Sequence, residues 1–113
     1  MADIVYINAD EGAKRVMNNT KLYIKLLGKF KDDQSLSQID SALSAGNTEA
    51  ARNASHTLKG LAANLSLTEL FKQVAELEGQ IKAGSVSSDQ IVLVKNVYNQ
   101  TMIEMDKVIA QYG

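Results

Sequence analysis

The sequence predicts an all-α protein, an antiparallel up-down-up-down four-helix bundle with short additional N-terminal helices. Its 113 residues include no proline and only seven glycines, so little interrupts a long helix and few tight hairpin turns are available. Apolar residues recur every three or four positions along most of the chain, as they do on the buried face of a helix. The connections between these segments are short, which makes neighbouring helices antiparallel.

Three helices are expected in the first 46 residues. Segment 5–7 is apolar and should pack across one end of the bundle. Segment 8–17 begins with the Asn-x-x-Glu pattern of a capped helix start. Further helices should span 20–31 and 33–46, the latter opened by its aspartate and ended by its glycine. The inward residues should be Tyr23, Leu26, Leu27 and Phe30, and then Leu36, Ile39 and Leu43.

The clearest predicted boundary lies between the next two helices. Asn47 should cap a helix that ends where Ser66-Leu67-Thr68-Glu69 has the sequence of a capping box, with Ser66 as the N-cap of the following helix. That helix should run to Ala83 and stop at Gly84, and the last helix should open at Ser87. The inward residues should be Ala50, Ala54, Leu58, Leu61 and Leu65; Leu70, Val74, Leu77 and Ile81; and Ile91, Val94, Tyr98, Met102, Met105, Ile109 and Tyr112.

Composition limits what the chain binds. With 12 basic and 13 acidic side chains the formal net charge is −1, which argues against nucleic acid or an anionic membrane as a partner. There is no cysteine, so thiol catalysis, disulfides and cysteine-ligated metal sites are excluded. No apolar run has the length of a membrane span, and there is no signal-peptide pattern. We expect a cytoplasmic monomer in which 1–113 is a single domain, and Met1 and the polar C-terminus favour a complete small protein over a module excised from a hybrid kinase.

The only histidine, His56, should stand on the outside of its helix. At about 3.6 residues per turn it falls opposite the apolar stripe, whereas a histidine held for packing would fall on that stripe. A neutral imidazole is a good nucleophile towards phosphorus near physiological pH, and covalent catalysis needs such a group exposed and unprotonated. The same outer face carries Glu49, Arg52, Asn53, Lys59, Gly60, Ala63 and Asn64.

Three further residues are assigned roles around His56. Lys59, one turn along, is placed to pair with phosphoryl oxygens, and Gly60 leaves room for another protein to approach closely. Counting equally far from the turn near Ser66 on both helices ends near Glu78, at the flank of the apolar stripe of its helix. There its carboxylate would accept a hydrogen bond from Nδ1–H and leave Nε2 facing outward, although Glu78 is equally well interpreted as ordinary surface charge.

A wider surface around this group is expected to bind a partner. The candidate residues are Arg52, Asn53, Ala63, Asn64 and Lys82, with Val16 and Met17 as candidate apolar docking residues. No phosphate-cradling glycine loop and no carboxylate constellation for Mg²⁺ stands out, and no base–nucleophile pair is evident. These are the parts that a nucleotide kinase or a hydrolase needs. The chain is therefore predicted not to be an enzyme, to bind no metal of its own, and to carry a group rather than hydrolyse it.

One resemblance to a known family is carried by the run Ser55-His56-Thr57-Leu58-Lys59-Gly60, continuing through Ala62-Ala63-Asn64-Leu65 and on to Leu77-Glu78. This run resembles a histidine-containing phosphotransfer (HPt) domain, the relay module of multistep two-component signalling, and the likeness extends more loosely over 22–30. The resemblance implies a helical bundle whose histidine takes a phosphoryl group from a receiver-domain aspartyl phosphate and passes it to another receiver aspartate.

By position, the resemblance implies His56 as the phospho-acceptor, Lys59 as the phosphate-stabilising residue and Gly60 as the clearance position. The partners would be receiver domains of response regulators or hybrid histidine kinases. Mg²⁺ would belong to the receiver, and this chain would need no cofactor.

The chain departs from the family pattern at two positions. The family often has glycine where this chain has Ser66, and a small residue where it has Leu61. The predicted capping box accounts for Ser66, and helical geometry directs Leu61 to the core. Two other functions stay open: the phospho-accepting domain of a chemotaxis-type histidine kinase, and a passive helical adaptor that binds partners without covalent chemistry.

Overall fold

A computed structural model describes residues 4–112, and within that range the protein is all-helical, as predicted. Met1 and Gly113, which entered the prediction about chain completeness, lie outside the described residues. The six helices of the described range are α1 (Ala9–Arg15), α2 (Thr20–Phe30), α3 (Ser35–Ser44), α4 (Thr48–Asn64), α5 (Thr68–Ala83) and α6 (Ser88–Tyr112).

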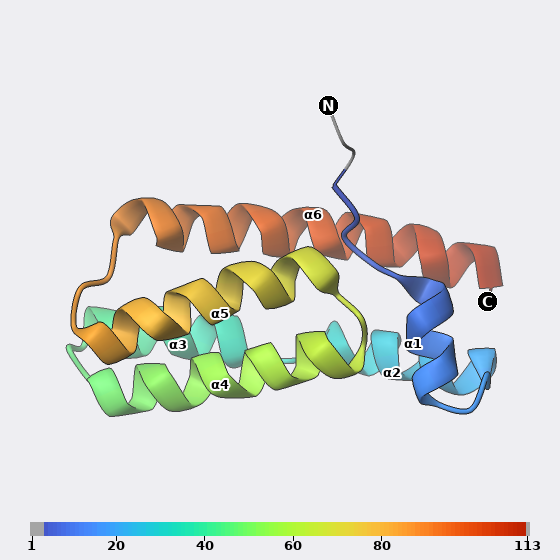
Figure 1. The fold of residues 1–113 in the computed structure, drawn as a ribbon, viewed down its shortest axis with the longest axis horizontal. Helices are drawn as coiled ribbons and strands as arrows, with labels where there is room; N and C mark the ends of the chain where they lie inside the picture. The colour runs from blue at the N-terminus through green and yellow to red at the C-terminus, as the bar shows by residue number, and fades with distance from the viewer. Residues whose placement is uncertain (1–3, 113) are drawn as a thin grey trace.

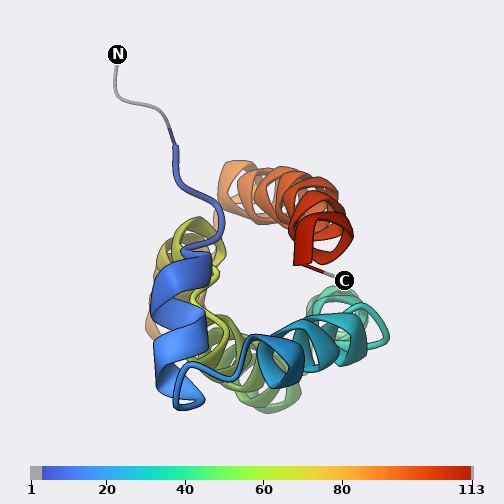
Figure 2. The ribbon, with the colours of Figure 1, turned by 90° about the vertical axis from the view of Figure 1, so that its right-hand side faces the viewer.

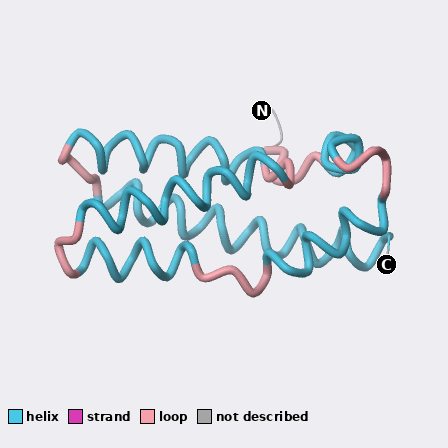
Figure 3. Tube along the Cα trace, turned by 90° about the horizontal axis from the view of Figure 1, so that it is seen from below, coloured by secondary structure: helices cyan, strands magenta, loops and turns pink. Residues whose placement is uncertain are grey.

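The three long helices lie side by side along the long axis, and α4 and α5 form a close antiparallel hairpin (Figure 1). The short helices α2 and α3 follow one another along the same axis, separated by the turn at 31–34 (Figure 3). Of this pair, α3 packs against α4 whereas α2 packs against α6. The column formed by α2 and α3 therefore changes its main neighbour halfway along the molecule.

Two of the predicted helix starts are capped as expected. The Asn8 side chain accepts a hydrogen bond from the Glu11 backbone N–H at 3.2 Å, and Asn47 accepts one from the Ala50 N–H at 3.1 Å. At the start of α3 the cap position is Gln34, one residue later than predicted. The Asp33 carboxylate still accepts hydrogen bonds from both the backbone N–H and the hydroxyl of Ser35. These side chains satisfy donors that a helix start leaves unpaired.

The predicted capping box at Ser66 is wrong. Helix α5 begins at Thr68 with no side-chain cap, and Ser66 has a left-handed backbone with φ 55°. Its N–H donates to the Ala63 carbonyl at 3.3 Å, and the Leu67 N–H donates to the Ala62 carbonyl at 2.8 Å. This is the Schellman pattern that ends a helix, and its left-handed position is usually glycine. Ser66 therefore terminates α4. The predicted N-cap role does not explain why this chain has serine where the family often has glycine.

The N-terminal segment packs across the turn between α4 and α5, as predicted (Figure 2). The Asn8 N–H donates to the Ser66 carbonyl at 2.9 Å, and the Ser66 hydroxyl donates to the Glu11 carboxylate at 3.0 Å. The buried Tyr23 hydroxyl donates to the Leu65 carbonyl at 2.6 Å. Burial, together with the charge of Glu11, raises the pKa of Tyr23 to about 12. This end of the bundle is thus fixed by polar contacts as well as by apolar packing.

A second fixed point is the packing of α1 on α2. A Cβ atom built on Gly12 would lie 2.3 Å from the Tyr23 ring, so only glycine lets the two helices come this close. The first helix ends at Arg15 rather than near Met17, because Met17 and Asn18 both have left-handed backbones.

The inward faces differ from the predicted ones by small rotations. On α6 the buried line includes Val97 and Thr101, whereas Tyr112, predicted to be inward, is exposed. On α4 the same rotation buries Ala51, Ser55 and Ala62, while Ala50 and Leu61 are only half-buried. Each helix packs against more than one neighbour. Its most buried residues therefore face the space between those neighbours and do not coincide with the centre of its apolar stripe. Leu61, predicted to point into the core, packs against the core but is only half-buried.

Candidate functional site

Helix α4 presents His56 to solvent. Its side chain is 73% exposed, whereas the preceding residue, Ser55, is completely buried at the edge of the helix face that meets the core. Ala51, Leu58 and Ala62 hold that buried side against the core, and this fixes the rotation of α4 about its axis. The exposure of the imidazole is therefore set by packing elsewhere on the same helix.

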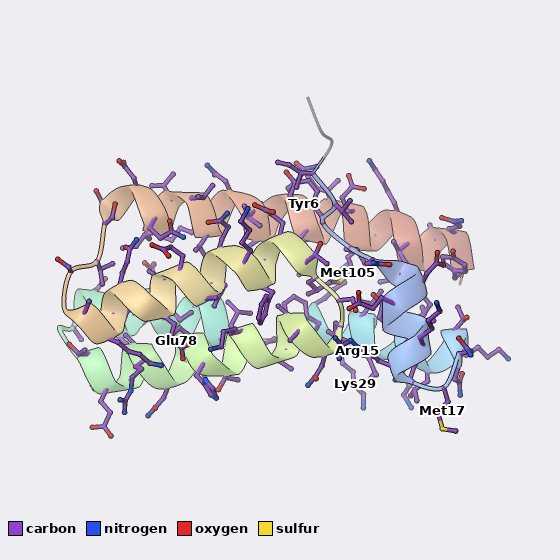
Figure 4. The ribbon with its side chains drawn as sticks, in the orientation of Figure 1. Tyr6, Arg15, Met17, Lys29, Glu78 and Met105 are labelled. Carbon is purple, nitrogen blue, oxygen red and sulfur yellow. The ribbon has the colours of Figure 1, made fainter. Side chains whose placement is uncertain are left out.

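Glu78 reaches the imidazole from α5. One carboxylate oxygen, Oε2, lies 3.1 Å from Nδ1 of His56, although Glu78 as a whole is only 3% exposed. Figure 4 shows this side chain at the junction of α4 and α5. A carboxylate can only accept a hydrogen bond, so in the neutral imidazole this contact favours the tautomer with the proton on Nδ1 and the lone pair on Nε2. Among the described residues Nε2 has no hydrogen-bond partner, which leaves it available for attack.

The other carboxylate oxygen of Glu78 binds Lys59. The Lys59 ammonium donates to Oε1 at 2.5 Å, and the Lys59 side chain is partly covered. One buried carboxylate therefore joins two residues that are one turn apart on α4. The one-turn spacing of His56 and Lys59 and the expected position of Glu78 are both visible in the sequence, and together they indicate this contact. The sequence-based prediction nevertheless gave Lys59 a role at the phosphate alone.

These contacts determine the ionisation of Glu78. Burial raises the pKa of its carboxyl group, but the hydrogen bond and charge of Lys59 lower it, with smaller contributions from Lys82 and His56, and the resulting pKa is lower than usual. Glu78 is thus ionised at neutral pH, as the hydrogen bond from Nδ1–H requires.

Two exposed glycines flank the pair formed by His56 and Glu78. A Cβ atom at Gly60 would have no neighbour within 4 Å, and the same holds for Gly79, which follows Glu78 on α5. Packing inside the molecule does not require glycine at either position. Gly60 is a predicted site residue, whereas Gly79 is not. Its position inside a helix, where glycine is unfavourable, is the feature of the sequence that indicates it.

The other candidate residues separate into three places. Arg52 and Lys82 line one shallow pocket next to Ile81, so the structure brings these two cations together. Ala63 lies beside Phe71, an aromatic residue that is 39% exposed and that sequence analysis missed.

Asn53 and Asn64 are exposed on α4, but neither shares a pocket with Arg52 and Lys82. Asn64 instead borders a groove facing α2, together with the half-buried Val16, while Met17 is 92% exposed in the turn before α2.

No group of three or more potential ligands among His, Cys, Asp and Glu comes together within residues 4–112 to hold a metal ion. Over the same part of the chain, no helix has both the length and the apolar character needed to cross a membrane.

The family model of the Hpt domain matches residues 25–109, most of the chain. The protein therefore belongs to the Hpt domain family, whose members are phosphocarriers that work with receiver domains in phosphorelays. The match includes α4 and α5, and with them His56, Lys59 and Glu78. No curated protein and no solved structure matches the chain significantly.

Proposed function

We propose that this protein is a histidine phosphocarrier that accepts a phosphoryl group on Nε2 of His56 from the aspartyl phosphate of one receiver domain and donates it to the aspartate of another. The observation that carries the proposal is the 3.1 Å contact between Nδ1 and the buried Glu78 carboxylate, because it directs the free lone pair of an exposed imidazole outward.

Each transfer exchanges one bond for another. The Nε2 lone pair attacks phosphorus, the bond from phosphorus to the aspartate oxygen breaks, and the aspartate leaves as a carboxylate. The ring keeps its proton on Nδ1 and becomes positively charged when the N–P bond forms. Glu78 is placed to stabilise that charge through the same hydrogen bond. The second transfer reverses these steps towards another aspartate.

Lys59 is the second participant. Its ammonium lies one turn from His56 and is bound to Glu78 before transfer. We propose that it turns towards the phosphoryl oxygens as negative charge arrives, since charge-assisted hydrogen bonds to phosphate are strong. The Mg²⁺ used in transfer would be held by the receiver, and this chain would contribute no cofactor and no hydrolytic group.

The surface around His56 suits a receiver. Gly60 and Gly79 provide a surface without side chains, Arg52 and Lys82 give positive charge on one side, and Phe71 gives apolar contact on the other. Receiver docking needs both contact area and charge complementarity. In this proposal the protein acts as a cytoplasmic monomer with one domain over 1–113. The bundle is formed by α4, α5, α6 and the column of α2 and α3.

The test is incubation with a receiver carrying labelled aspartyl phosphate. The expected product is acid-labile, base-stable label on this chain, absent in His56→Gln, with unchanged circular dichroism as the control for folding. Retention of label in His56→Gln would refute the proposal. Tight receiver binding without label would indicate a passive adaptor, and label obtained only with a kinase and ATP would indicate the phospho-accepting domain of a chemotaxis-type system.

A further inference from the structure

Glu78 has two partners in the unphosphorylated protein. Its Oε2 lies 3.1 Å from Nδ1 of His56, and its Oε1 accepts a hydrogen bond from the Lys59 ammonium at 2.5 Å. The carboxylate is almost completely buried, since the Glu78 side chain is only 4% exposed. Charges interact more strongly in such an environment than in water. A change in the charge of either partner therefore affects the other through Glu78.

Three cations and one carboxylate lie close to the imidazole. On α4, Arg52 and Lys59 are each within about one turn of His56. On α5, Lys82 is about one turn beyond Glu78 and lines a pocket with Arg52. A positive charge disfavours a proton on the ring, whereas a negative charge within about 4–6 Å favours it. Of these four groups, only Glu78 favours the protonated ring.

The other acidic residues of the neighbouring helices have different partners or lie farther away. Glu76 of α5 is exposed and accepts a hydrogen bond from the Gln80 side chain. Asp40, the acidic residue of α3, is paired with Lys95 of α6 at 3.1 Å. Glu49 is about two turns away from the histidine on α4. Within residues 4–112, no other acidic side chain contacts the imidazole.

The protonation state of a phosphorylated imidazole decides how easily the phosphoryl group leaves it. When the N–P bond breaks, its electron pair returns to Nε2, and phosphorus bonds an oxygen of the receiving carboxylate or of water. A ring with a proton on Nδ1 leaves as neutral imidazole, whereas a ring without that proton has to leave as an imidazolate anion. The neutral leaving group is much better, so phosphohistidine is reactive when its ring is protonated.

Building on the proposed function, we infer that Glu78 keeps the phosphorylated ring of His56 protonated above neutral pH. The buried carboxylate then has a charged partner in each state: Lys59 before transfer, and the imidazolium once Lys59 has turned to the phosphoryl oxygens. Loss of the ring proton would leave a buried carboxylate without a charged partner, which is strongly unfavourable. Glu78 thereby sets the lifetime of the phosphohistidine, and His56 passes the phosphoryl group on rather than storing it.

The test labels the full chain with phosphoramidate, a small phosphoryl donor that phosphorylates histidine without a receiver. His56 is the only histidine, and ³¹P NMR identifies the phosphorylated nitrogen. Because no receiver is used, the outcome is separate from that of the transfer assay. Glu78→Gln keeps an oxygen that accepts the hydrogen bond from Nδ1–H but removes the charge. Glu76→Gln removes the same charge from an exposed position on α5 and is the matched control.

The rate of phosphate loss should depend on pH in a way that identifies the charge of Glu78. At pH 9 the wild type should lose phosphate at least about fivefold faster than Glu78→Gln, since a neighbouring opposite charge moves a titration by roughly 1–3 pH units. At about pH 5 both rings are protonated, so the wild type should exceed Glu78→Gln by no more than about twofold. The pKa of Glu78 is lowered, so its carboxylate stays charged over this range. Glu76→Gln should match the wild type within about twofold at both pH values.

A second measurement needs no variant and decides the question if circular dichroism shows that Glu78→Gln is unfolded. The ³¹P chemical shift of phosphohistidine follows the protonation of its ring. Its midpoint should lie at least about one pH unit higher in the folded wild type than in the same chain unfolded in urea. Equal midpoints in the folded and unfolded chain would overturn the inference. Equal or faster phosphate loss from folded Glu78→Gln at pH 9, or the same slowing in Glu76→Gln, would also overturn it.

Discussion

The buried carboxylate of Glu78 binds the imidazole of His56 with one oxygen, at 3.1 Å, and the ammonium of Lys59 with the other. The nucleophile and its neighbouring cation are therefore positioned by one group from a different helix. A change at any of the three residues should alter the other two.

Replacing Glu78 with alanine should slow phosphorylation of His56 by about tenfold, since a hydrogen bond to a charged group contributes about 1.5–3 kcal/mol and His56 is largely exposed. The ring should also lose its preference for the Nδ1–H form, which ¹⁵N NMR of the imidazole measures directly. Transfer at the wild-type rate in Glu78→Ala, with an unchanged tautomer ratio, would show that Glu78 is only a surface charge.

Replacing Lys59 with methionine should destabilise the protein at neutral pH by about 1–3 kcal/mol, because it leaves a buried carboxylate without its main partner. The pKa of Glu78 is lowered in the folded protein. The stabilisation it provides is therefore present above its unfolded value and is lost as the pH falls through the folded value. In Lys59→Met, burial is the dominant influence on Glu78, so the pKa of its carboxyl group should rise. Protonation of Glu78 then removes the cost of the buried charge at a higher pH than in the wild type.

The difference in unfolding free energy between wild type and Lys59→Met should consequently narrow from pH 7 to about pH 4, the region of the ordinary carboxyl pKa. Urea unfolding at the two pH values measures it. Lys72→Met, an exposed change on α5, is the control and should have little effect at either pH. A gap between wild type and Lys59→Met that stays constant with pH would contradict the role assigned to the ion pair.

Replacing Gly60 with glutamine should separate stability from function. A Cβ atom at this position meets nothing within 4 Å, and glutamine is the better helix former by up to about 1 kcal/mol, so the unfolding free energy should be unchanged or higher. Phosphotransfer from a receiver should fall at least tenfold because the added side chain obstructs close approach. Gly28→Gln, equally unhindered on α2, should leave transfer intact. Equal transfer by the two variants would argue against a clearance role for Gly60.

Replacing Gly12 with alanine should lower the unfolding free energy by about 1–3 kcal/mol, the usual cost of overpacking, because the new Cβ would lie 2.3 Å from the Tyr23 ring. Thermal unfolding compared with Gly28→Ala, which should be neutral or stabilising, measures the effect. A variant as stable as wild type would mean that α1 moves away from Tyr23 at little cost.

Much of the site could be predicted because it depends on local regularities. The apolar stripe of α4 fixes the direction of His56, and counting from the hairpin turn leads to the neighbourhood of Glu78. Ser66 was misassigned because a serine followed three residues later by glutamate is also compatible with a helix that ends there. Its left-handed backbone and its bond to Glu11, 55 positions away, are properties of the folded chain.

The contact between Lys59 and Glu78 and the groove between α2 and α4 were missed for a related reason. Lys59 has two candidate partners, the phosphoryl group and the Glu78 carboxylate. Only the burial of Glu78, a property of the folded chain, shows that Lys59 binds the carboxylate before transfer. The groove forms because α2 packs mainly against α6 and not against α4. Leu61 of α4 therefore lines the groove. Helix periodicity describes one helix at a time and does not predict which helices pack against each other.

The change of neighbour at 31–34 also gives the two halves of the molecule unequal packing. In the half that contains the imidazole, α4 packs closely against both α3 and α5, whereas α2 packs mainly against α6 and the short α1 and is joined to the end of α4 by the hydrogen bond from Tyr23 to Leu65. Helices with fewer buried contacts open at lower free energy. Amide protons of α1 and α2 should therefore exchange with deuterium well before those of α4 and α5, so the N-terminal end can detach while the phosphate-bearing hairpin stays folded.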